Sequence, residues 1–377
     1  MRKIIVIPDS FKGSLSSADF CAAARGAILS VLPDAEVIGV PVADGGEGSA
    51  ECFLAACGGE KIPLTVSGPF SEPVNAYYAR LPDGTAVVET AVCAGLTLAG
   101  ERKSAADTTT FGVGELIGHA LDHGCRKLIL CLGGSATNDG GAGMTSALGF
   151  RFYDADGNAF VPVGRTLSAI KRIDASGAHP LLGKVPIEAM CDVNNPLCGQ
   201  RGAARVFAPQ KGATEEEVDL LDRGLGHFAG IVGEELGKDI LDLPGAGAAG
   251  GMGWGAVAFL GAELCSGIET VLDTVRFDDL LRDADLVITG EGKLDSQTLG
   301  GKVVVGVARR ARRRGVVAIA VVGAVGEGAE AICGEGVTGV FPICPGPISL
   351  EDAMEHAEEN LVRTVTNLMR FFVGTKG

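Results

Sequence analysis

The sequence predicts an α/β protein in which both chain ends form a Rossmann-like parallel-sheet domain and a mixed α/β domain is inserted between them. Three observations support this fold class. The chain opens with short apolar runs that are each followed by a helical pattern. The same alternation of predicted strand and helix returns near the C-terminus, and it is absent from the residues between. A chain of 377 residues is also longer than one hydrophobic core usually supports. We therefore predict one domain from residues 1–60 plus 284–377 and a second from residues 61–283.

Two strand-helix units open the chain. The run Lys3–Ile7 is apolar and ends in a polar turn, which is typical of a buried strand, and the spacing of apolar residues predicts a helix over Ser16–Val31. A second strand over Glu36–Val40 and a second helix over Ala50–Ala56 follow. Strands that alternate with helices in this way imply a parallel sheet.

Three more strands are predicted near the C-terminus. The run AIAVVG is continuously apolar, as expected of a parallel strand that is covered on both faces. The predicted strands are Leu286–Thr289, Val316–Val322 and Val337–Ile343, and the predicted helices are Lys302–Arg314, Glu327–Cys333 and Leu350–Phe371. With the two N-terminal strands, they are enough for one doubly wound sheet.

The middle of the chain predicts mixed structure. One hairpin is expected around Pro82-Asp83-Gly84 and another over residues 150–160, with further strands over Leu128–Leu132 and Val185–Cys191. The uncharged stretch Leu243–Ala262 is long enough to cross a bilayer, but glycine and alanine dominate it. We interpret it as a glycine-rich loop that enters a buried helix.

Composition excludes several classes of partner. The chain has 32 basic and 47 acidic residues, and this net charge of -15 would repel nucleic acid and an anionic membrane surface. None of the 11 cysteines forms a C-x-x-C pair, and the first apolar run is too short for the core of a signal peptide. We therefore expect a cytoplasmic protein with small-molecule substrates, no nucleic acid and no membrane, and we leave a homo-oligomer open.

Polar, glycine-rich loops follow the predicted strands, where open α/β sheets bind their ligands. Asp9, Ser10 and Lys12 follow the first strand, and a lysine beside small donors suits an anionic oxygen, although a capped helix explains these residues equally well. Asp44 and Glu47 follow the second strand and could hold a magnesium ion or orient a substrate hydroxyl, although a plain turn explains them equally well. The loop at residues 289–302 combines two carboxylates, Glu291 and Asp295, with lysines and Gln297, as a site for phosphates and their metal would require.

Two loops of the middle domain carry similar chemistry. In GGSATNDGGAG, successive backbone N–H groups can form an anion-binding nest ahead of the following helix. Its candidate site residues are Gly133, Gly134, Ser135, Asn138 and Asp139. In CDVNNPLCG, Asp192 can accept a hydroxyl proton during phosphoryl transfer and Asn195 can bind a metal or a hydroxyl, but a turn before proline explains both as well.

Three other patterns carry little weight. Residues 245–250 match the glycine pattern of dinucleotide sites, yet a good preceding strand and the distant acidic residue are missing. The sequence contains no P-loop motif. His119 and His123 have the spacing of metal ligands, but no third ligand lies near them in the sequence.

Six strings in chain order resemble the glycerate kinase type 1 family, and they span essentially the whole chain: DSFKGS, DGGEGS, GGSATNDGG, CDVNNPLCG, VFAPQKGA and GEGKLDSQTLGGK. The resemblance implies ATP-dependent phosphorylation of D-glycerate, usually at the 2-hydroxyl, with ATP and Mg²⁺ as cofactors. It also implies a flavodoxin-like domain formed by both chain ends. The matching signature positions are Asp9, Ser10, Lys12, Asp44, Glu47, Ser135, Asn138, Asp139, Asp192, Asn195, Gln210, Lys211, Asp295 and Gln297. Ser49 and Val304 stand where the family often has threonine and proline, and neither change removes a charged group.

On this resemblance we assign roles to individual residues. Asp192 is expected to accept or orient the attacking hydroxyl, and Lys12 and Lys211 to neutralise phosphate or carboxylate charge. Asp295 and Glu291 are the metal candidates, and the loop GGSATNDGG would donate hydrogen bonds to an anion. A kinase of another small hydroxy acid, a non-catalytic metabolite-binding protein and a dinucleotide-dependent oxidoreductase remain as alternatives.

Overall fold

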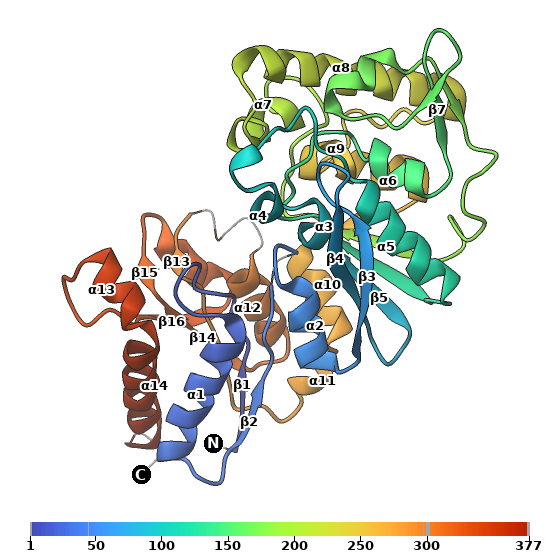
Figure 1. The fold of residues 1–377 in the computed structure, drawn as a ribbon. Coiled ribbons are helices and arrows are strands. Elements are labelled where there is room, and N and C mark those ends of the chain that lie inside the picture. Colours follow the sequence, from blue (N-terminus) through green and yellow to red (C-terminus); the bar gives the residue numbers. More distant parts are fainter. Residues whose placement is uncertain (1, 44, 297, 299–301, 375–377) are drawn as a thin grey trace. The chain divides into compact units, whose positions relative to one another are not determined.

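The computed structural model describes residues 2–43, 45–296, 298 and 302–374 (Figure 1). Backbone proximity groups the chain into two compact units. The first unit comprises Met1–Asp44, Glu51–Gly58 and Ser266–Gly377, and the second comprises Gly45–Ala50 and Gly59–Cys265. Residues 45–50 thus group with the second unit and residues 266–283 with the first, whereas the predicted ranges assign them the other way. The domain boundaries predicted from the sequence stay a prediction.

The first unit contains a five-stranded sheet in which every neighbouring pair is parallel. In spatial order its strands are β2 (Glu36–Gly39), β1 (Lys3–Val6), β12 (Leu286–Thr289), β14 (Val317–Val322) and β16 (Val337–Pro342). Numbered along the chain, this order is 2-1-3-4-5, which is the flavodoxin-like arrangement. The predicted fold class is therefore confirmed, and all five predicted strands form.

Helices cover both faces of this sheet. Ile4 and Ile288 belong to a buried cluster that also contains residues of α1 and α14, which pack against each other. The alternating residue Val287 is equally buried and points to the opposite face, where α12 packs on β12 and β14. The helices of the unit are α1 (Ser17–Val31), α10 (Gly267–Thr274), α11 (Phe277–Leu280), α12 (Val303–Arg313), η6 (Ala329–Glu335), α13 (Leu350–Glu355) and α14 (Ala357–Gly374). A short parallel pair, β13 (Lys293–Leu294) and β15 (Ala324–Val325), completes it.

Two helix predictions for this unit need correction. The final helix predicted over Leu350–Phe371 is two helices, because His356 leaves the helical region at φ -101° and ψ 19° and ends α13. The two helices also cover different surfaces, since α13 has no buried residue whereas α14 buries a face that includes Leu361 and Val365. The helix predicted over Glu327–Cys333 is a 3₁₀ helix, η6.

The second unit contains a mixed six-stranded sheet. Its order is β11 (Glu263–Cys265), β10 (Ile187–Met190), β6 (Lys127–Cys131), β5 (Thr85–Glu89), β4 (Pro73–Arg80) and β3 (Glu60–Ser67). The first four strands are parallel, and β4 and β3 continue the sheet in antiparallel fashion. A separate antiparallel sheet consists of β8 (Ala159–Phe160), β7 (Arg151–Tyr153) and β9 (Arg172–Asp174). Both predicted hairpins are confirmed, as the pairs β4–β5 and β7–β8.

The remaining helices are mostly short, apart from α5 and α8. They are α2 (Ser49–Cys57), which continues into the first unit, α3 (Ala91–Ala94), α4 (Leu96–Ala99), η1 (Gly100–Arg102), α5 (Phe111–Asp122), α6 (Ala142–Ala147), η2 (Gly164–Ala169), α7 (Ala203–Phe207), η3 (Pro209–Lys211), α8 (Glu215–Leu236), α9 (Ala248–Gly255) and the π-helix η4 (Ala256–Leu260).

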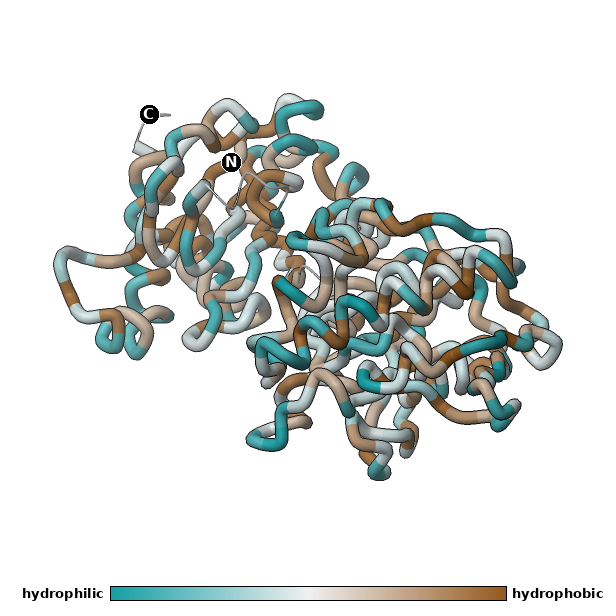
Figure 2. Tube along the Cα trace, turned by 90° about the horizontal axis from the view of Figure 1, so that it is seen from above, coloured by the Kyte–Doolittle hydropathy of each residue, from teal (hydrophilic) through white to brown (hydrophobic). Residues whose placement is uncertain are grey.

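The glycine-rich stretch around α9 is buried, as predicted. Trp254 is fully buried and its ring meets that of Phe228 at a centroid distance of 5.1 Å, in a cluster that also includes Phe259. Hydrophobic stretches elsewhere along the chain are short and are interrupted by hydrophilic residues (Figure 2). Among the described residues, no helix is both long and apolar enough to cross a membrane.

Candidate functional site

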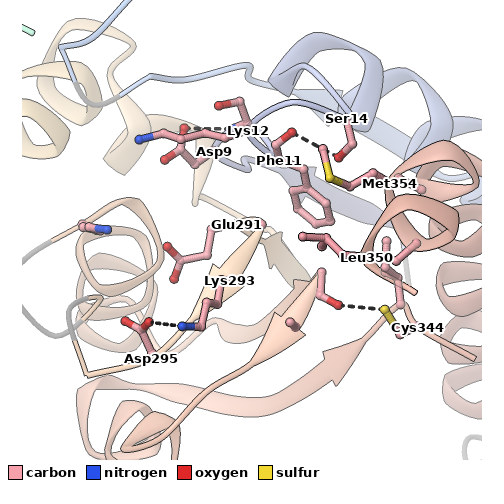
Figure 3. Close-up of a pocket in the computed structure, with 18 residues that line it drawn as sticks. Asp9, Phe11, Lys12, Ser14, Glu291, Lys293, Asp295, Cys344, Leu350 and Met354 are labelled. Carbon is pink, nitrogen blue, oxygen red and sulfur yellow. Dashed lines mark hydrogen bonds and ion pairs between the residues drawn. The ribbon is translucent and has the colours of Figure 1, made fainter. Parts of the chain in front are cut away.

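A cavity of about 520 Å³ lies in the first unit (Figure 3). Its lining comes largely from the loops that leave the carboxyl ends of β1, β12, β14 and β16. Strand order reverses between β1 and β12, and such a switch point is where open α/β sheets bind ligands. Five of the predicted site residues line this cavity: Asp9, Ser10, Lys12, Glu291 and Asp295.

The loop after β1 is held by the neighbouring strand and by its own turn. The Asp9 N–H donates to the Gly290 carbonyl over 2.8 Å, which extends the β1–β12 pairing beyond the strands. Phe11 then pairs with Leu15 across a tight turn. The Ser16 side chain caps α1 by accepting a hydrogen bond from the Asp19 N–H. Lys12 is exposed at the turn and makes no ion pair with any described residue.

The loop after β12 buries a carboxylate. Glu291 is only 6% exposed and accepts a hydrogen bond of 2.7 Å from the Thr298 hydroxyl. Burial raises the pKa of Glu291 to about 7, and the neighbouring Asp9 and Asp295 carboxylates act in the same direction against the opposing effects of Thr298 and Lys302. Asp295 is less buried and forms an ion pair of 3.1 Å with Lys293. With a pKa of about 7, the Glu291 carboxyl can exchange a proton near neutral pH.

Two glycines bring these loops close together. A Cβ atom on Gly290 would lie 2.1 Å from the Val321 carbonyl oxygen, and one on Gly323 would lie 2.3 Å from the Gly292 carbonyl oxygen. Because backbone atoms are in the way, only glycine fits without a shift of a strand. The close approach of the loops after β12 and β14 allows the Gly323 N–H to donate to the Glu291 carbonyl over 3.1 Å.

The second unit has its own polar cluster in the loop after β6. Lys211 is 3% exposed and its Nζ donates to the Ser135 hydroxyl over 2.8 Å and to the Thr137 carbonyl over 2.7 Å. Burial lowers the pKa of Lys211 to about 7, while the Asp139 charge opposes that shift. The structure thus brings together Ser135 and Lys211, which are 76 positions apart in the sequence.

The Asp139 side chain is hydrogen-bonded to neighbouring loops inside the second unit. Its carboxylate is fully buried and accepts hydrogen bonds from the N–H and hydroxyl of Thr110 and from the N–H groups of Gly141 and Gly143. Burial raises its pKa, while these hydrogen bonds act to lower it. The predicted anion nest therefore encloses the carboxylate of its own loop, and this geometry favours an architectural role for Asp139 over ligand contact.

Asn138 is the residue before Asp139, and its side-chain amide makes no hydrogen bond to any described residue. The side chain is fully buried, and neither its Oδ1 nor its Nδ2 has a hydrogen-bond partner among the described residues. The buried hydroxyl of Thr137 is in the same situation. Buried polar groups usually find a partner, so these atoms mark a place where a water or a polar ligand would be stabilised.

The loop at residues 45–50 packs against the carboxyl ends of the second sheet. The Gly133 N–H donates to the Gly45 carbonyl over 2.9 Å, and a Cβ atom on Gly133 would lie 2.6 Å from the Gly46 Cα. Glu89, at the end of β5, is 1% exposed and accepts from the Gly48 N–H over 2.9 Å. Glu47 in turn accepts a hydrogen bond from the Thr97 hydroxyl over 3.3 Å. The first glycine of GGSATNDGG, Gly133, is thus needed because a side chain there would clash with the loop at residues 45–50.

The remaining predicted residues are placed as follows. Asp192 is exposed directly after β10. The Asn195 amide donates to the Arg201 carbonyl over 2.7 Å, which closes its own loop. Gln210 is exposed in η3, next to the buried Lys211. Asp44 and Gln297 lie outside the described residues.

Sequence reasoning missed two groups of residues. Glu89 ends an apolar strand, and an isolated acid at a strand end gives only a weak signal. The second group consists of apolar residues that line the cavity of the first unit and includes Ile343, Leu350 and Met354. These apolar residues belong to segments predicted as ordinary strand and helix, so only the structure identifies them.

Comparison with known proteins gives consistent matches over the whole chain. A model described as the glycerate kinase family matches residues 4–373. The chain is 46% identical over 368 residues to a glycerate kinase of Bacillus subtilis (strain 168), covering 97% of this chain and 96% of that protein. It is 43% identical to a glycerate 2-kinase of Escherichia coli (strain K12), with 97% of both chains covered. The crystal structure of a protein assigned as glycerate kinase 2 from Salmonella typhimurium LT2 superposes with a TM-score of 0.90 at 42% identity, covering 100% of this chain and 99% of that one.

Proposed function

The chain belongs to the glycerate kinase family, and on that premise we propose that it is an ATP-dependent kinase that phosphorylates D-glycerate at the 2-hydroxyl to give 2-phosphoglycerate. The similarity to the E. coli protein, whose name specifies the 2-position, supports this regiochemistry. The observation that carries the proposal is the agreement of whole-chain similarity with a cavity at the switch point that gathers lysines and carboxylates. The proposed location of the protein is the cytoplasm.

The charged residues of the first-unit cavity are proposed to hold the ATP phosphates and a Mg²⁺ ion. Lys12 would neutralise phosphate charge, with Asp9 and Ser10 shaping the loop beside it. Mg²⁺ usually takes one or two protein carboxylates together with phosphate oxygens and waters, and Glu291 and Asp295 offer such a pair. No group of three or more His, Cys, Asp or Glu side chains in the described part of the chain is arranged to hold a metal. The ion would therefore depend on the nucleotide for its other ligands, and when bound it offsets charge on the phosphoryl group.

The polar cluster of the second unit is proposed to recognise the organic acid. Lys211 fixes the Ser135 hydroxyl, and with the backbone N–H of Gly134 this hydroxyl would be directed at an anionic oxygen. The candidate Gly133 would support the loop, because its N–H donates to the Gly45 carbonyl. Asn138 has an amide ready for a polar ligand or a water. Glu47 and Gln210 are further candidates for substrate contact, and Asn195 would hold the loop that carries Asp192.

Asp192 is proposed as the proton acceptor. Its carboxylate would take the proton of the glycerate hydroxyl as the new O–P bond forms and the bond to ADP breaks. Its exposure directly after β10 leaves it accessible to a substrate.

The test is ADP release measured with ATP, Mg²⁺ and D-glycerate, with the position of the phosphate read by phosphorus NMR. We expect release that depends on D-glycerate and a 2-phosphoglycerate product. Tartronate, lactate and erythronate serve as comparison acids. Turnover with one of them but not with D-glycerate would keep the kinase and replace its substrate, and no turnover with any acid would contradict the proposal in favour of a binding protein.

A further inference from the structure

The cavity of the first unit has two chemically different ends (Figure 3). Asp9, Lys12, Glu291, Lys293 and Asp295 gather at one end, and Phe11, Leu350, Met354 and Cys344 lie at the other. The kinase proposal uses only the charged end. The apolar end is assigned to nothing by that proposal, and it makes up much of the lining.

The apolar wall is built by α13 and the turn after β1. Leu350, at the first position of α13, is 76% exposed, although it faces the cavity and is a large apolar residue. One turn further along the helix, Met354 reaches toward Gly13, where an added Cβ atom would lie 2.8 Å from the Met354 Cε. Phe11 is buried, lines the cavity and packs on Phe20 at a ring-centroid distance of 5.4 Å.

This wall suits a flat, apolar ring. Leucine gains free energy when a ligand covers its exposed surface, and the thioether of methionine makes favourable contacts with aromatic rings. The Cys344 thiol already donates to the Gly323 carbonyl over 3.2 Å. Proteins usually bind the hydrophobic part of a small molecule against apolar side chains that line a cavity.

The charged end suits phosphates. Lys12, Lys293 and Lys302 line it together with the three carboxylates, and Lys12 makes no ion pair with any residue that the structure describes. A cavity of about 520 Å³ is within the range of small-molecule sites. A three-carbon acid would leave most of it to water, whereas a nucleoside triphosphate has a base for one end and a phosphate chain for the other.

We propose that this cavity is the nucleotide site and that it holds ATP in one orientation, with the adenine base on the wall of Phe11, Leu350 and Met354 and the phosphates toward Lys12 and Lys293. The proposal rests on the proposed kinase function and adds the residues that recognise the base. It predicts that Leu350 and Met354 contribute to the binding of nucleotides but not to the binding of phosphate chains that lack a base.

The test compares ADP with tripolyphosphate as ligands in isothermal titration calorimetry with Mg²⁺. Leu350→Ser should weaken ADP binding about tenfold, because burial of one leucine side chain contributes that much or more, and should leave the tripolyphosphate Kd unchanged. Ile348→Ser is the matched control, because Ile348 is also exposed, at 43%, and lies in the same segment but outside the cavity lining. Met354→Ser provides a second variant with the same expectation, and circular dichroism verifies that each variant folds.

Three results would overturn this placement. One is an unchanged ADP Kd in both wall variants, another is an equal loss for ADP and tripolyphosphate, and the third is a loss of D-glycerate binding in place of ADP binding. The wild-type turnover assay separates this inference from the kinase proposal. Glycerate-dependent turnover together with a wild-type ADP Kd in both wall variants defeats only the base site, whereas absence of turnover with any acid defeats the kinase function itself.

Discussion

Glu291→Gln should make the first unit more stable at alkaline pH. The folded-state pKa of about 7 lies above the ordinary value of 4.5, so the folded protein keeps a proton that the unfolded chain releases between these pH values. Stability therefore falls as pH rises from 4.5 to 7, and the full cost applies above 7. A shift of this size corresponds to about 3 kcal/mol. Glutamine removes that cost and can still accept the hydrogen bond from Thr298.

The assay is equilibrium urea unfolding at pH 5 and pH 8 in EDTA. Far-UV circular dichroism reports both units, whereas the fluorescence of Trp254, the single tryptophan, reports the second unit. We expect a gain of as much as about 3 kcal/mol at pH 8 and a much smaller one at pH 5, in the circular dichroism transition but not in the fluorescence transition. Glu330→Gln, an exposed acid of the same unit, is the control. An equal gain at both pH values, or a gain in the control, would refute the assignment of the cost to a buried carboxylate.

Three further predictions test the architecture and the chemistry. Asp139→Asn should destabilise the second unit by about 2–4 kcal/mol in urea unfolding followed by Trp254 fluorescence, because an amide leaves buried N–H donors unpaired; an unchanged midpoint would contradict the architectural role. Gly290→Ala should cost more than about 2 kcal/mol in thermal unfolding, since its Cβ would meet the Val321 carbonyl, whereas Gly26→Ala, inside α1 with open space around it, should be neutral or stabilising. Asp192→Asn should lower kcat by about 10²–10⁴-fold in the ADP-release assay with little change in ADP affinity, and a kcat within a few fold of wild type would remove Asp192 from the proton-transfer role.

The sheet of the first unit could be predicted because its strands carry their signal locally. The run at β14 is apolar on both faces, and such a run has few alternatives to a buried parallel strand. The break at His356 could not be predicted in this way. The residues on both sides of this break, LEDAME and AEENL, mostly favour helices. What separates α13 from α14 is the surface that each one covers, which depends on the rest of the fold.

For the candidate site, the sequence predicted which loops carry the chemistry but not what each side chain does there. Lys12 and Asp139 have the same standing as charged residues in glycine-rich loops, yet one is exposed beside a cavity and the other is enclosed by four hydrogen bonds. The difference depends on Thr110, which lies 29 positions away in the sequence. Burial and partners are long-range properties, and a motif contains only short-range information.

Burial also explains why the pKa values of Glu291 in the first unit and Lys211 in the second shift in opposite directions. Desolvation disfavours the charged form of any group, so it raises the pKa of Glu291 and lowers that of Lys211, and both reach about 7. Each group therefore stands near the point where a nearby charge decides its protonation: a cation favours the ionised carboxylate, and an anion favours the ammonium. The proposed ligands, Mg²⁺ beside Glu291 and a carboxylate or phosphate oxygen near Ser135 and Lys211, would each supply the charge that its group needs. Burial of Glu291 and of Lys211 thus disfavours their charged forms in the absence of ligand. A ligand of opposite charge would offset this cost, and each site would therefore favour such a ligand.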